Sequence, residues 1–332
     1  MQTPAYPLRF APVPHARLWG GDRIARRYCR TGLPAQCGES WEISAHPDGR
    51  GPLLNGPWAG LDLAELTRKF GRELIGAATP EPDRFPLLFK IIDARIDLSV
   101  QVHPNAAAAR TLGGESKHES WYLLDGRPES ALYAGMLPGM EPARFGEAMR
   151  TGTVAACLHT LPAVPGGTLD IPGGLVHAIG AGCLVYEVQQ NANTTYRLFD
   201  WNRRDASGRP RTLHLREGLA AIDWTLPPPR LHTPPDLPDA WQTCCETPFF
   251  TLRTIRLTRP SILRPDGLSF HALFVAEGSC DVATDGGIER LETGASCLIP
   301  ACVAEYSVTP LGGEARLLKT VVATGGGRQR PH

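Results

Sequence analysis

Short apolar runs, each bounded by turn residues, follow one another along most of the chain. The clearest of them span 87–94, 97–104, 119–126, 183–190, 194–201, 249–257, 270–278, 295–300 and 315–323. Runs of this length with turn residues between them are typical of β-strands. The 35 glycines and 31 prolines supply that punctuation and disfavour a helical bundle. We therefore expect a mostly β chain.

Two segments have helical spacing instead. Residues 62–76 carry Asp62 where an N-cap belongs and apolar side chains three to four residues apart, and Gly76 suits the end of the helix. A second helical stretch is expected over 141–161, with a break near Gly152. The pattern thus predicts a mostly β fold with a few short helices.

The Pro-rich segment 225–240 is the best candidate for a linker, because consecutive prolines cannot sustain a strand ladder. It divides the chain into 1–224, which would hold the active site, and an all-β part, 241–332. A Gly–strand–Pro pattern occurs once in each part, but the second copy has Glu305 where the first has His177. We therefore expect a metal site in the first part alone.

Composition excludes several classes of partner. Lys and Arg together number 34, as do Asp and Glu, so the chain has no electrostatic footprint for nucleic acid. No apolar run is long enough for a membrane span, and the first residues do not read as a secretory signal. The nine cysteines form no CxxC pair, which favours reduced thiols in the cytoplasm. These features predict a cytoplasmic protein; they leave the oligomeric state open.

The stretch SVQVHPN, residues 99–105, carries the first candidate chemistry. In a strand, Ser99, Gln101 and His103 leave the same face. Together with Glu119 and with His177 in a Pro-Gly turn, they follow the order of the cupin metal motifs, H-x-H then Glu, and later P-x-G-x-x-H. Imidazole and carboxylate are ligands of zinc and similar divalent ions. Gln101 stands where the generic motif has its first histidine.

Charged residues accompany these positions. Lys90 lies within an apolar run, Lys117 precedes Glu119 by two residues, and Arg197 is on a later strand. A buried lysine needs a partner, because an unpaired buried charge is costly. Glu187 fits two roles equally: a proton shuttle beside a metal, or the ion-pair partner of one of these cations.

Four segments, KIIDARIDLSVQVHPN, GESKHESWYLL, IPGGLVHAIGAG and EVQQNANTTYRLFDWNR, resemble the short bacterial form of the type I mannose-6-phosphate isomerases, members of the cupin superfamily. WGG (19–21) and GESWEISAHPDG (38–49) also resemble N-terminal motifs of that family. Two features depart from it. Asn193 stands where the family commonly has Asp, and the helical insert of the longer members is absent.

The resemblance implies two cupin-type jelly-roll β-barrels or sandwiches with a few short helices. It also implies one zinc ion per chain, in the first cupin, held by Gln101, His103, Glu119 and His177. It implies a zinc-dependent aldose–ketose isomerase that interconverts mannose 6-phosphate and fructose 6-phosphate through an enediol. The family's remaining active-site positions match catalytic Arg197, Glu187 and Lys117 and substrate-binding Trp19, Lys90 and Ser99. Glu187 is our hypothesis for the base, while Arg197 and Lys117 would stabilise the anionic intermediate or bind phosphate.

Three alternatives differ in the chemistry they require. An iron-dependent cupin oxygenase would not need the lysines and arginine around the pocket. A non-catalytic sugar-binding cupin predicts damage to the ligand positions, and all four are filled here. A cupin isomerase of another free or phosphorylated sugar has the same residues, so the sequence leaves it open.

Overall fold

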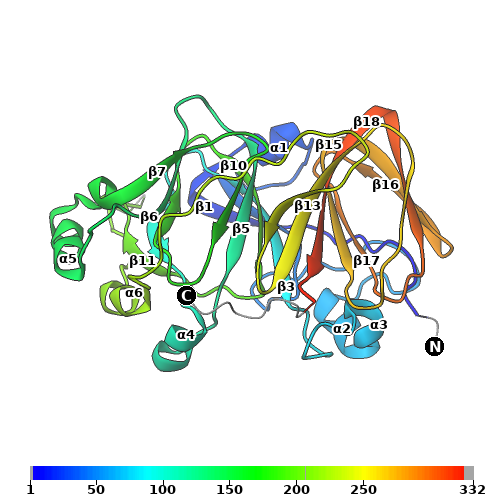
Figure 1. The fold of residues 1–332 in the computed structure, drawn as a ribbon, viewed down its shortest axis with the longest axis horizontal. Helices are drawn as coiled ribbons and strands as arrows, with labels where there is room; N and C mark the ends of the chain where they lie inside the picture. Colours follow the sequence, from blue (N-terminus) through cyan, green and yellow to red (C-terminus); the bar gives the residue numbers. More distant parts are fainter. Residues whose placement is uncertain (1–2, 206, 325–332) are drawn as a thin grey trace.

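Three antiparallel β-sheets dominate the computed structural model, which describes residues 3–205 and 207–324 (Figure 1). The central sheet consists, in spatial order, of β1 (Val13–Gly21), β2 (Cys37–Ile43), β3 (Leu87–Asp93), β10 (Leu184–Gln190), β5 (Glu119–Asp125) and β8 (Thr168–Ile171). The second sheet consists of β11 (Tyr196–Phe199), β4 (Val100–Val102), β9 (His177–Ile179), β6 (Ala131–Met136) and β7 (Leu158–Pro162). The prediction of a mostly β chain is confirmed.

The third sheet belongs to the C-terminal part. Its path runs through β12 (Gln242–Glu246), β13 (Phe250–Leu257), β18 (Tyr306–Val322), β15 (His271–Thr284) and β16 (Gly287–Glu292), with β14 (Ser261–Leu263) paired to β18 and β17 (Ser296–Ile299) paired to β15. The helices are short: α1 (Arg23–Arg27), α2 (Leu63–Phe70), α3 (Arg72–Ile75), α4 (Ala106–Leu112), α5 (Pro142–Thr151), α6 (Leu215–Ala221) and the 3₁₀ turn Val154–Cys157. None of the described helices is long and apolar enough to cross a membrane.

The sheets are stacked so that the central sheet is covered on both faces (Figure 1). One face packs on the second sheet through residues such as Trp121, Val185 and Ile179. The other packs on the C-terminal sheet, where Tyr186 stacks on Phe274 with ring centroids 4.3 Å apart. This double burial explains why its inner strands read as almost continuous apolar runs. Any charged side chain on the face toward the second sheet is therefore held in the interior.

The helix expected over 62–76 is present, with one interruption. The Asp62 side chain accepts a hydrogen bond from the backbone of Glu65, whose side chain accepts from the backbone of Asp62, a complete capping box. Gly71, with φ of 50°, ends α2 and separates it from α3, and Gly76 ends α3. The sequence pattern thus identified the buried face but not the break.

The second expected helix, 141–161, is only partly correct. Helix α5 ends at Thr151, and Gly152 with φ of 74° terminates it, as the break near Gly152 anticipated. Beyond the 3₁₀ turn, residues 158–162 form β7 and pair with β6. Pairing at the edge of the second sheet outweighs the helical spacing of these last residues.

The Pro-rich segment 225–240 contacts both parts of the chain. The backbone of His232 bridges that of Thr168 in β8, and Asp236 forms ion pairs with arginines of β13 and β18. The N-terminal part also contacts the C-terminal part directly, since Leu8 pairs with Leu298 in β17. The division into 1–224, 225–240 and 241–332 stays a prediction.

Candidate active site

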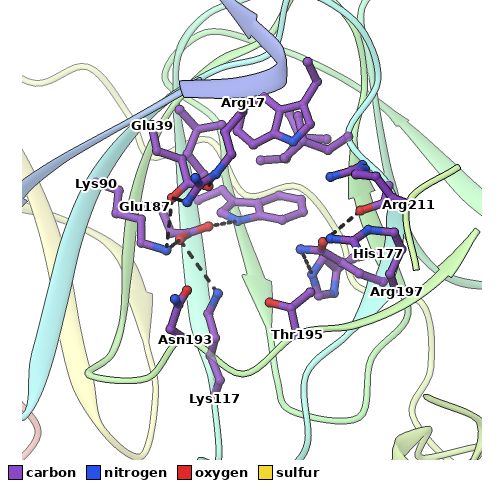
Figure 2. Close-up of a pocket in the computed structure, with 17 residues that line it drawn as sticks. Arg17, Glu39, Lys90, Lys117, His177, Glu187, Asn193, Thr195, Arg197 and Arg211 are labelled. Carbon is purple, nitrogen blue, oxygen red and sulfur yellow. Dashed lines mark hydrogen bonds and ion pairs between the residues drawn. The ribbon is translucent and has the colours of Figure 1, made fainter. Parts of the chain in front are cut away.

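A cavity of about 390 Å³ opens between the central sheet and the second sheet (Figure 2). Strands β1, β2, β3, β5 and β10 line it from one side, and β4, β9 and β11 line it from the other. The lining residues are Arg17, Trp19, Glu39, Lys90, Ile92, Leu98, Ser99, Gln101, Lys117, Trp121, His177, Ile179, Glu187, Asn193, Thr195, Arg197 and Arg211.

Strand alternation places side chains of opposite charge on one wall of this cavity. Lys90 and Glu187 are directly opposed in the register of β3 and β10, and their Nζ and Oε1 atoms lie 3.3 Å apart. Their neighbours Phe89 and Tyr186 point to the other face, into the core shared with the C-terminal sheet. Both charged side chains are almost fully buried, so each depends on the other for compensation.

Glu187 is held from three directions. The Trp121 indole donates a hydrogen bond of 3.0 Å to Oε2, while Lys90 and Lys117 lie 3.3 Å and 4.0 Å from Oε1. Burial lowers the pKa of Lys117, but Glu119 and Glu187 raise it, and the net shift is upward. Lys117 is therefore protonated at neutral pH, and the carboxylate of Glu187 faces two ammonium groups.

Next to this pair, three side chains from both sheets converge: His103, Glu119 and His177, whose ligating atoms lie within 4.8 Å of one another. The Nε2 atoms of the two histidines are 3.3 Å and 3.5 Å from the carboxylate oxygens of Glu119. Gln101 is paired with His177 in the register of β4 and β9, and its amide nitrogen lies 3.3 Å from Nε2 of His177. All four predicted metal ligands thus meet at one point.

The backbone fixes how the two histidines present themselves. Nδ1 of His103 donates to the carbonyl oxygen of Thr194, and Nδ1 of His177 donates to that of Leu175, both at 2.9 Å. Each Nε2 then carries a lone pair. Burial, followed by Lys117, lowers the pKa of His103 to about 4, and burial lowers the pKa of His177. Both rings are neutral at pH 7, the state that binds a metal.

The ligand atoms of His103, Glu119 and His177 are arranged as a cation site requires. Nε2 of His103 is buried and has no hydrogen-bond partner within the described residues, although a carboxylate oxygen of Glu119 lies 3.3 Å away. With the hydrogen of His103 on Nδ1, two lone pairs face each other in the interior, an arrangement that a cation between them would satisfy. Burial raises the pKa of Glu119, but Lys117 and His103 lower it well below its ordinary value, so the carboxylate is ionised. Two imidazoles, a carboxylate and an amide suit a divalent ion.

Two arginines, Arg197 and Arg211, line the cavity on the side of the second sheet, where Arg197 is paired with Gln101 in the register of β11 and β4. Arg197 donates to the carbonyl of Thr212, its Nε is buried without a partner, and no described carboxylate lies within ion-pair distance of it. Arg211 lies beside it and binds Asp200, which Arg203 also contacts. Burial, followed by Arg211, lowers the pKa of Arg197. Asp200 is thus shared by Arg203 and Arg211, and Arg197 has no carboxylate partner among the described residues.

Comparisons with known proteins place this architecture in a family. Residues 8–134 match the family model of the type I phosphomannose isomerase catalytic domain. The chain is 34% identical to mannose-6-phosphate isomerase ManA of Bacillus subtilis over 91% of its own length and 95% of that protein. It is also 34% identical to the mannose-6-phosphate isomerase of Streptococcus mutans, over 75% of this chain and 78% of that one.

The chain belongs to the type I phosphomannose isomerase family. The crystal structure of the Bacillus subtilis mannose 6-phosphate isomerase superposes with a TM-score of 0.85 at 28% identity, covering 95% of this chain and 99% of that one. Membership makes the chain an isomerase and sets aside the oxygenase alternative. The resemblance drawn from the sequence motifs is confirmed.

The ten residues predicted for the site lie around one cavity. Eight of them line it: Trp19, Lys90, Ser99, Gln101, Lys117, His177, Glu187 and Arg197. His103 and Glu119 lie just behind that lining, against His177 and Lys117. Their individual roles stay predictions.

Sequence reasoning missed several residues of this cavity, chiefly Arg17, Glu39, Thr195 and Arg211. Arg17 binds Glu39 with a contact of 2.8 Å. The signal was available for one of them. Arg17 precedes Trp19 by two residues in β1, the same spacing that linked Gln101 to His103. Arg211 comes from a loop, where no such periodicity exists.

Proposed function

We propose that this protein interconverts mannose 6-phosphate and fructose 6-phosphate, that it requires zinc, and that the reaction passes through an enediol. The observation that carries the proposal is the juxtaposition of Glu187, fixed by Trp121 and Lys90, with the His103–Glu119–His177 cluster in one cavity. The curated relatives that share about a third of the sequence are named mannose-6-phosphate isomerases, which supports the same substrate.

Gln101, His103, Glu119 and His177 would hold the zinc ion, since neutral imidazoles and an ionised carboxylate are ligands that it accepts. Bound there, zinc would polarise the sugar oxygens next to the carbon that loses a proton. Ser99 lines the cavity and donates to Oε1 of Gln101, which links a substrate-contacting hydroxyl to the ligand set.

Glu187 is the base in this proposal. The reaction moves one proton between C2 and C1, and a carboxylate at the wall of the cavity can remove it and return it on the same face of the sugar. Trp121 fixes Oε2, which leaves Oε1 as the oxygen that faces the two lysines. Lys117 lies between Glu119 and Glu187, where a fixed ammonium group stabilises negative charge that develops on the sugar oxygens.

The charge distribution favours one orientation of the substrate. At the wall around Glu187, the cations Arg17, Lys90 and Lys117 are matched by the carboxylates Glu39, Glu119 and Glu187. On the side of the second sheet, Arg211 pairs with Asp200, and no described carboxylate lies within ion-pair distance of Arg197. A phosphate carries nearly two negative charges at pH 7. We therefore assign the phosphate to Arg197 and Arg211 and the reacting carbons to the wall that carries Glu187, with Trp19 against the sugar.

The test is a coupled assay of mannose 6-phosphate conversion by the purified protein. Activity should disappear with a strong chelator and return with zinc. In D₂O, the fructose 6-phosphate formed should carry deuterium at C1, because the proton removed from C2 can exchange with solvent while the base holds it and before it is returned to C1. Full retention of the substrate hydrogen would argue for hydride transfer and against the enediol. A protein that is active after its metal is stripped does not need zinc.

Glu187→Gln tests the base directly. The amide keeps the shape and the Trp121 contact but cannot take up the proton, so turnover should fall by about 10²–10⁴-fold. Zinc content should stay at the wild-type level, because Glu187 is not among the ligands. Glu129→Gln, in an exposed loop, is the matched control and should behave as wild type. Near-normal turnover of Glu187→Gln would place the base elsewhere.

A further inference from the structure

One edge of the cavity is formed by the segment 193–195, which also reaches the metal cluster. Asn193 and Thr195 line the cavity, and the carbonyl oxygen of Thr194 between them accepts the hydrogen bond of 2.9 Å from Nδ1 of His103. The position of this segment therefore sets the tautomer and the ring orientation of a predicted ligand. It is not part of a strand, so other contacts must hold it.

Glu115 provides two of those contacts. Its carboxylate oxygen Oε2 accepts from the backbone N–H of Asn193 at 2.9 Å, and its own N–H donates to Oγ1 of Thr194 at 3.0 Å. Nε2 of His46 lies 3.4 Å from the same carboxylate oxygen. A single acidic side chain thus links the turn after β2, the loop before β5 and the segment that fixes His103.

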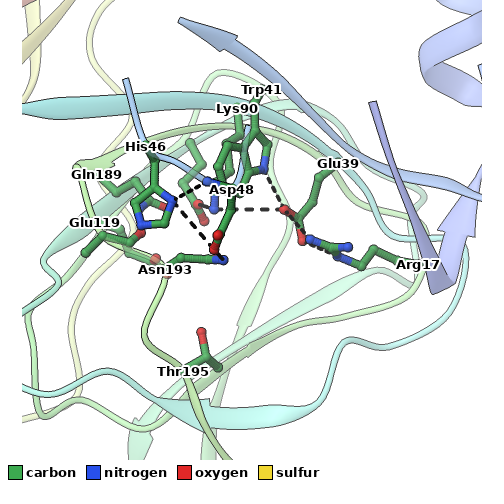
Figure 3. Close-up of polar contacts among 12 residues, drawn as sticks. Arg17, Glu39, Trp41, His46, Asp48, Lys90, Glu119, Gln189, Asn193 and Thr195 are labelled. Carbon is green, nitrogen blue, oxygen red and sulfur yellow. Dashed lines mark hydrogen bonds and ion pairs between the residues drawn. The ribbon is translucent and has the colours of Figure 1, made fainter. Parts of the chain in front are cut away.

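Asp48 supplies a third contact, from the turn that follows β2 (Figure 3). Its Oδ2 accepts from the Asn193 side-chain amide at 2.7 Å. The turn is itself well fixed. Nδ1 of His46 accepts from the backbone of Asp48, the carbonyl of His46 accepts from Gly49, and the buried His46 ring packs edge-on against Trp41. Asp48 therefore reaches the segment from a rigid base.

We propose that Glu115 and Asp48 are positioning residues for the metal site: they hold segment 193–195 so that the Thr194 carbonyl keeps His103 in its ligating orientation. The inference rests on the proposed zinc dependence. Partners of metal-ligating histidines typically change metal affinity or activity by about 10–100-fold when they are removed. Glu115 and Asp48 contact Asn193, so their effect on zinc affinity would reach His103 through the peptide carbonyl of Thr194.

Because these two residues are exposed, a role in positioning the metal ligand can be distinguished from a contribution to folding stability. The side chains of Glu115 and Asp48 are 37% and 56% exposed, so their loss should cost little folding free energy. Their contacts nevertheless lie one hydrogen bond away from a fully buried ligand. A positioning role thus predicts a large loss of metal affinity with a small change in melting temperature.

The experiment measures the zinc dissociation constant of the apo-protein by competition with a chromophoric chelator, next to the melting temperature. Glu115→Ala should bind zinc about 10-fold more weakly than wild type. Glu115→Gln keeps an oxygen to accept the Asn193 N–H and should stay within about threefold of wild type, since the orienting hydrogen bond survives. Glu129→Ala, an exposed glutamate away from the site, should match wild type. The melting temperature of each variant should change by only a few degrees.

Asp48→Ala and Asn193→Ala test the second contact. Each should weaken zinc binding, and the double variant should be no weaker than the worse single one, because both remove the same hydrogen bond. Wild-type zinc affinity in Glu115→Ala and Asp48→Ala would overturn the inference and leave the proposed function standing. A loss of affinity that merely follows a large drop in melting temperature would also overturn it. A wild-type protein that binds no zinc would overturn both proposals.

Discussion

Glu39 illustrates how the buried charges of the cavity depend on their neighbours. Arg17 contacts both of its carboxylate oxygens, at 2.8 Å and 3.2 Å, and the indole of Trp41 donates to one of them at 2.8 Å. Lys90 lies 3.9 Å away and also sits over the Trp41 ring. Burial raises the pKa of Glu39, but Lys90 and Arg17 lower it, and the net value is about 2.

This pKa predicts how stability changes with pH. A glutamate that titrates at about 2 when folded and near 4.5 when unfolded stabilises the folded state above pH 4.5, and loses that contribution as pH falls toward 2. The difference corresponds to roughly 3 kcal/mol. Glu39→Gln should therefore be less stable than wild type at pH 7, and the gap should narrow below pH 4.5.

Urea unfolding at a series of pH values measures this gap. Glu129→Gln is the control, because that glutamate lies in an exposed loop, and its stability should follow the wild-type curve. A gap between wild type and Glu39→Gln that stays constant from pH 7 to pH 3 would show that Glu39 titrates normally in the folded protein.

At the scale of elements, strand alternation made much of the site predictable. Ser99, Gln101 and His103 leave one face of the chain around β4, and that face does look into the cavity. Periodicity acts within one strand, however, and says nothing about which strands face each other. Arg211 and the 193–195 segment come from loops whose positions depend on tertiary contacts, so the sequence alone did not identify Arg211 or Thr195. Pairing with β6 likewise turned 158–162 into a strand.

The two sheets that form the cavity contribute ligands jointly. His177 belongs to β9 and Gln101 to β4 of the second sheet, with His103 directly after β4, whereas Glu119 belongs to β5 of the central sheet. A bound ion would therefore join the sheets. Ligands that bind only the folded state stabilise it by about 4 kcal/mol when their concentration is a thousand times the dissociation constant.

We thus expect chelation to lower the melting temperature by roughly 6 °C, since each kcal/mol shifts the melting temperature by about 1.5 °C in a chain of this size. Calorimetry with and without a chelator measures the shift, and added zinc should reverse it. His103→Ala should melt at the same temperature under both conditions, because it lacks a ligand. An equal response of His103→Ala and wild type to the chelator would mean that the stabilising ion binds elsewhere.

At the scale of the whole molecule, the C-terminal sheet supports the central sheet, which carries Glu187. The face of the central sheet that looks away from the cavity shares one hydrophobic core with β13, β15 and β18. Phe89, Tyr186 and Val188 come from one side of this core, and Phe250 and Phe274 from the other. The sequence marked these strands as apolar runs but could not say which part of the chain covers this face. Because Tyr186 and Val188 pack in this core, the C-terminal part anchors the backbone that carries Glu187 between them.

This shared core predicts that the described parts of the chain unfold together. Phe274 is fully buried and stacks on Tyr186, so Phe274→Ala should cost about 3–5 kcal/mol. Phe249, 36% exposed, is the matched control, and Phe249→Ala should cost much less. Calorimetry should show a single transition for wild type and a single transition at lower temperature for Phe274→Ala, with activity lost in step with the unfolding signal. Two separate transitions, with activity surviving the first, would mean that the C-terminal sheet does not support the site.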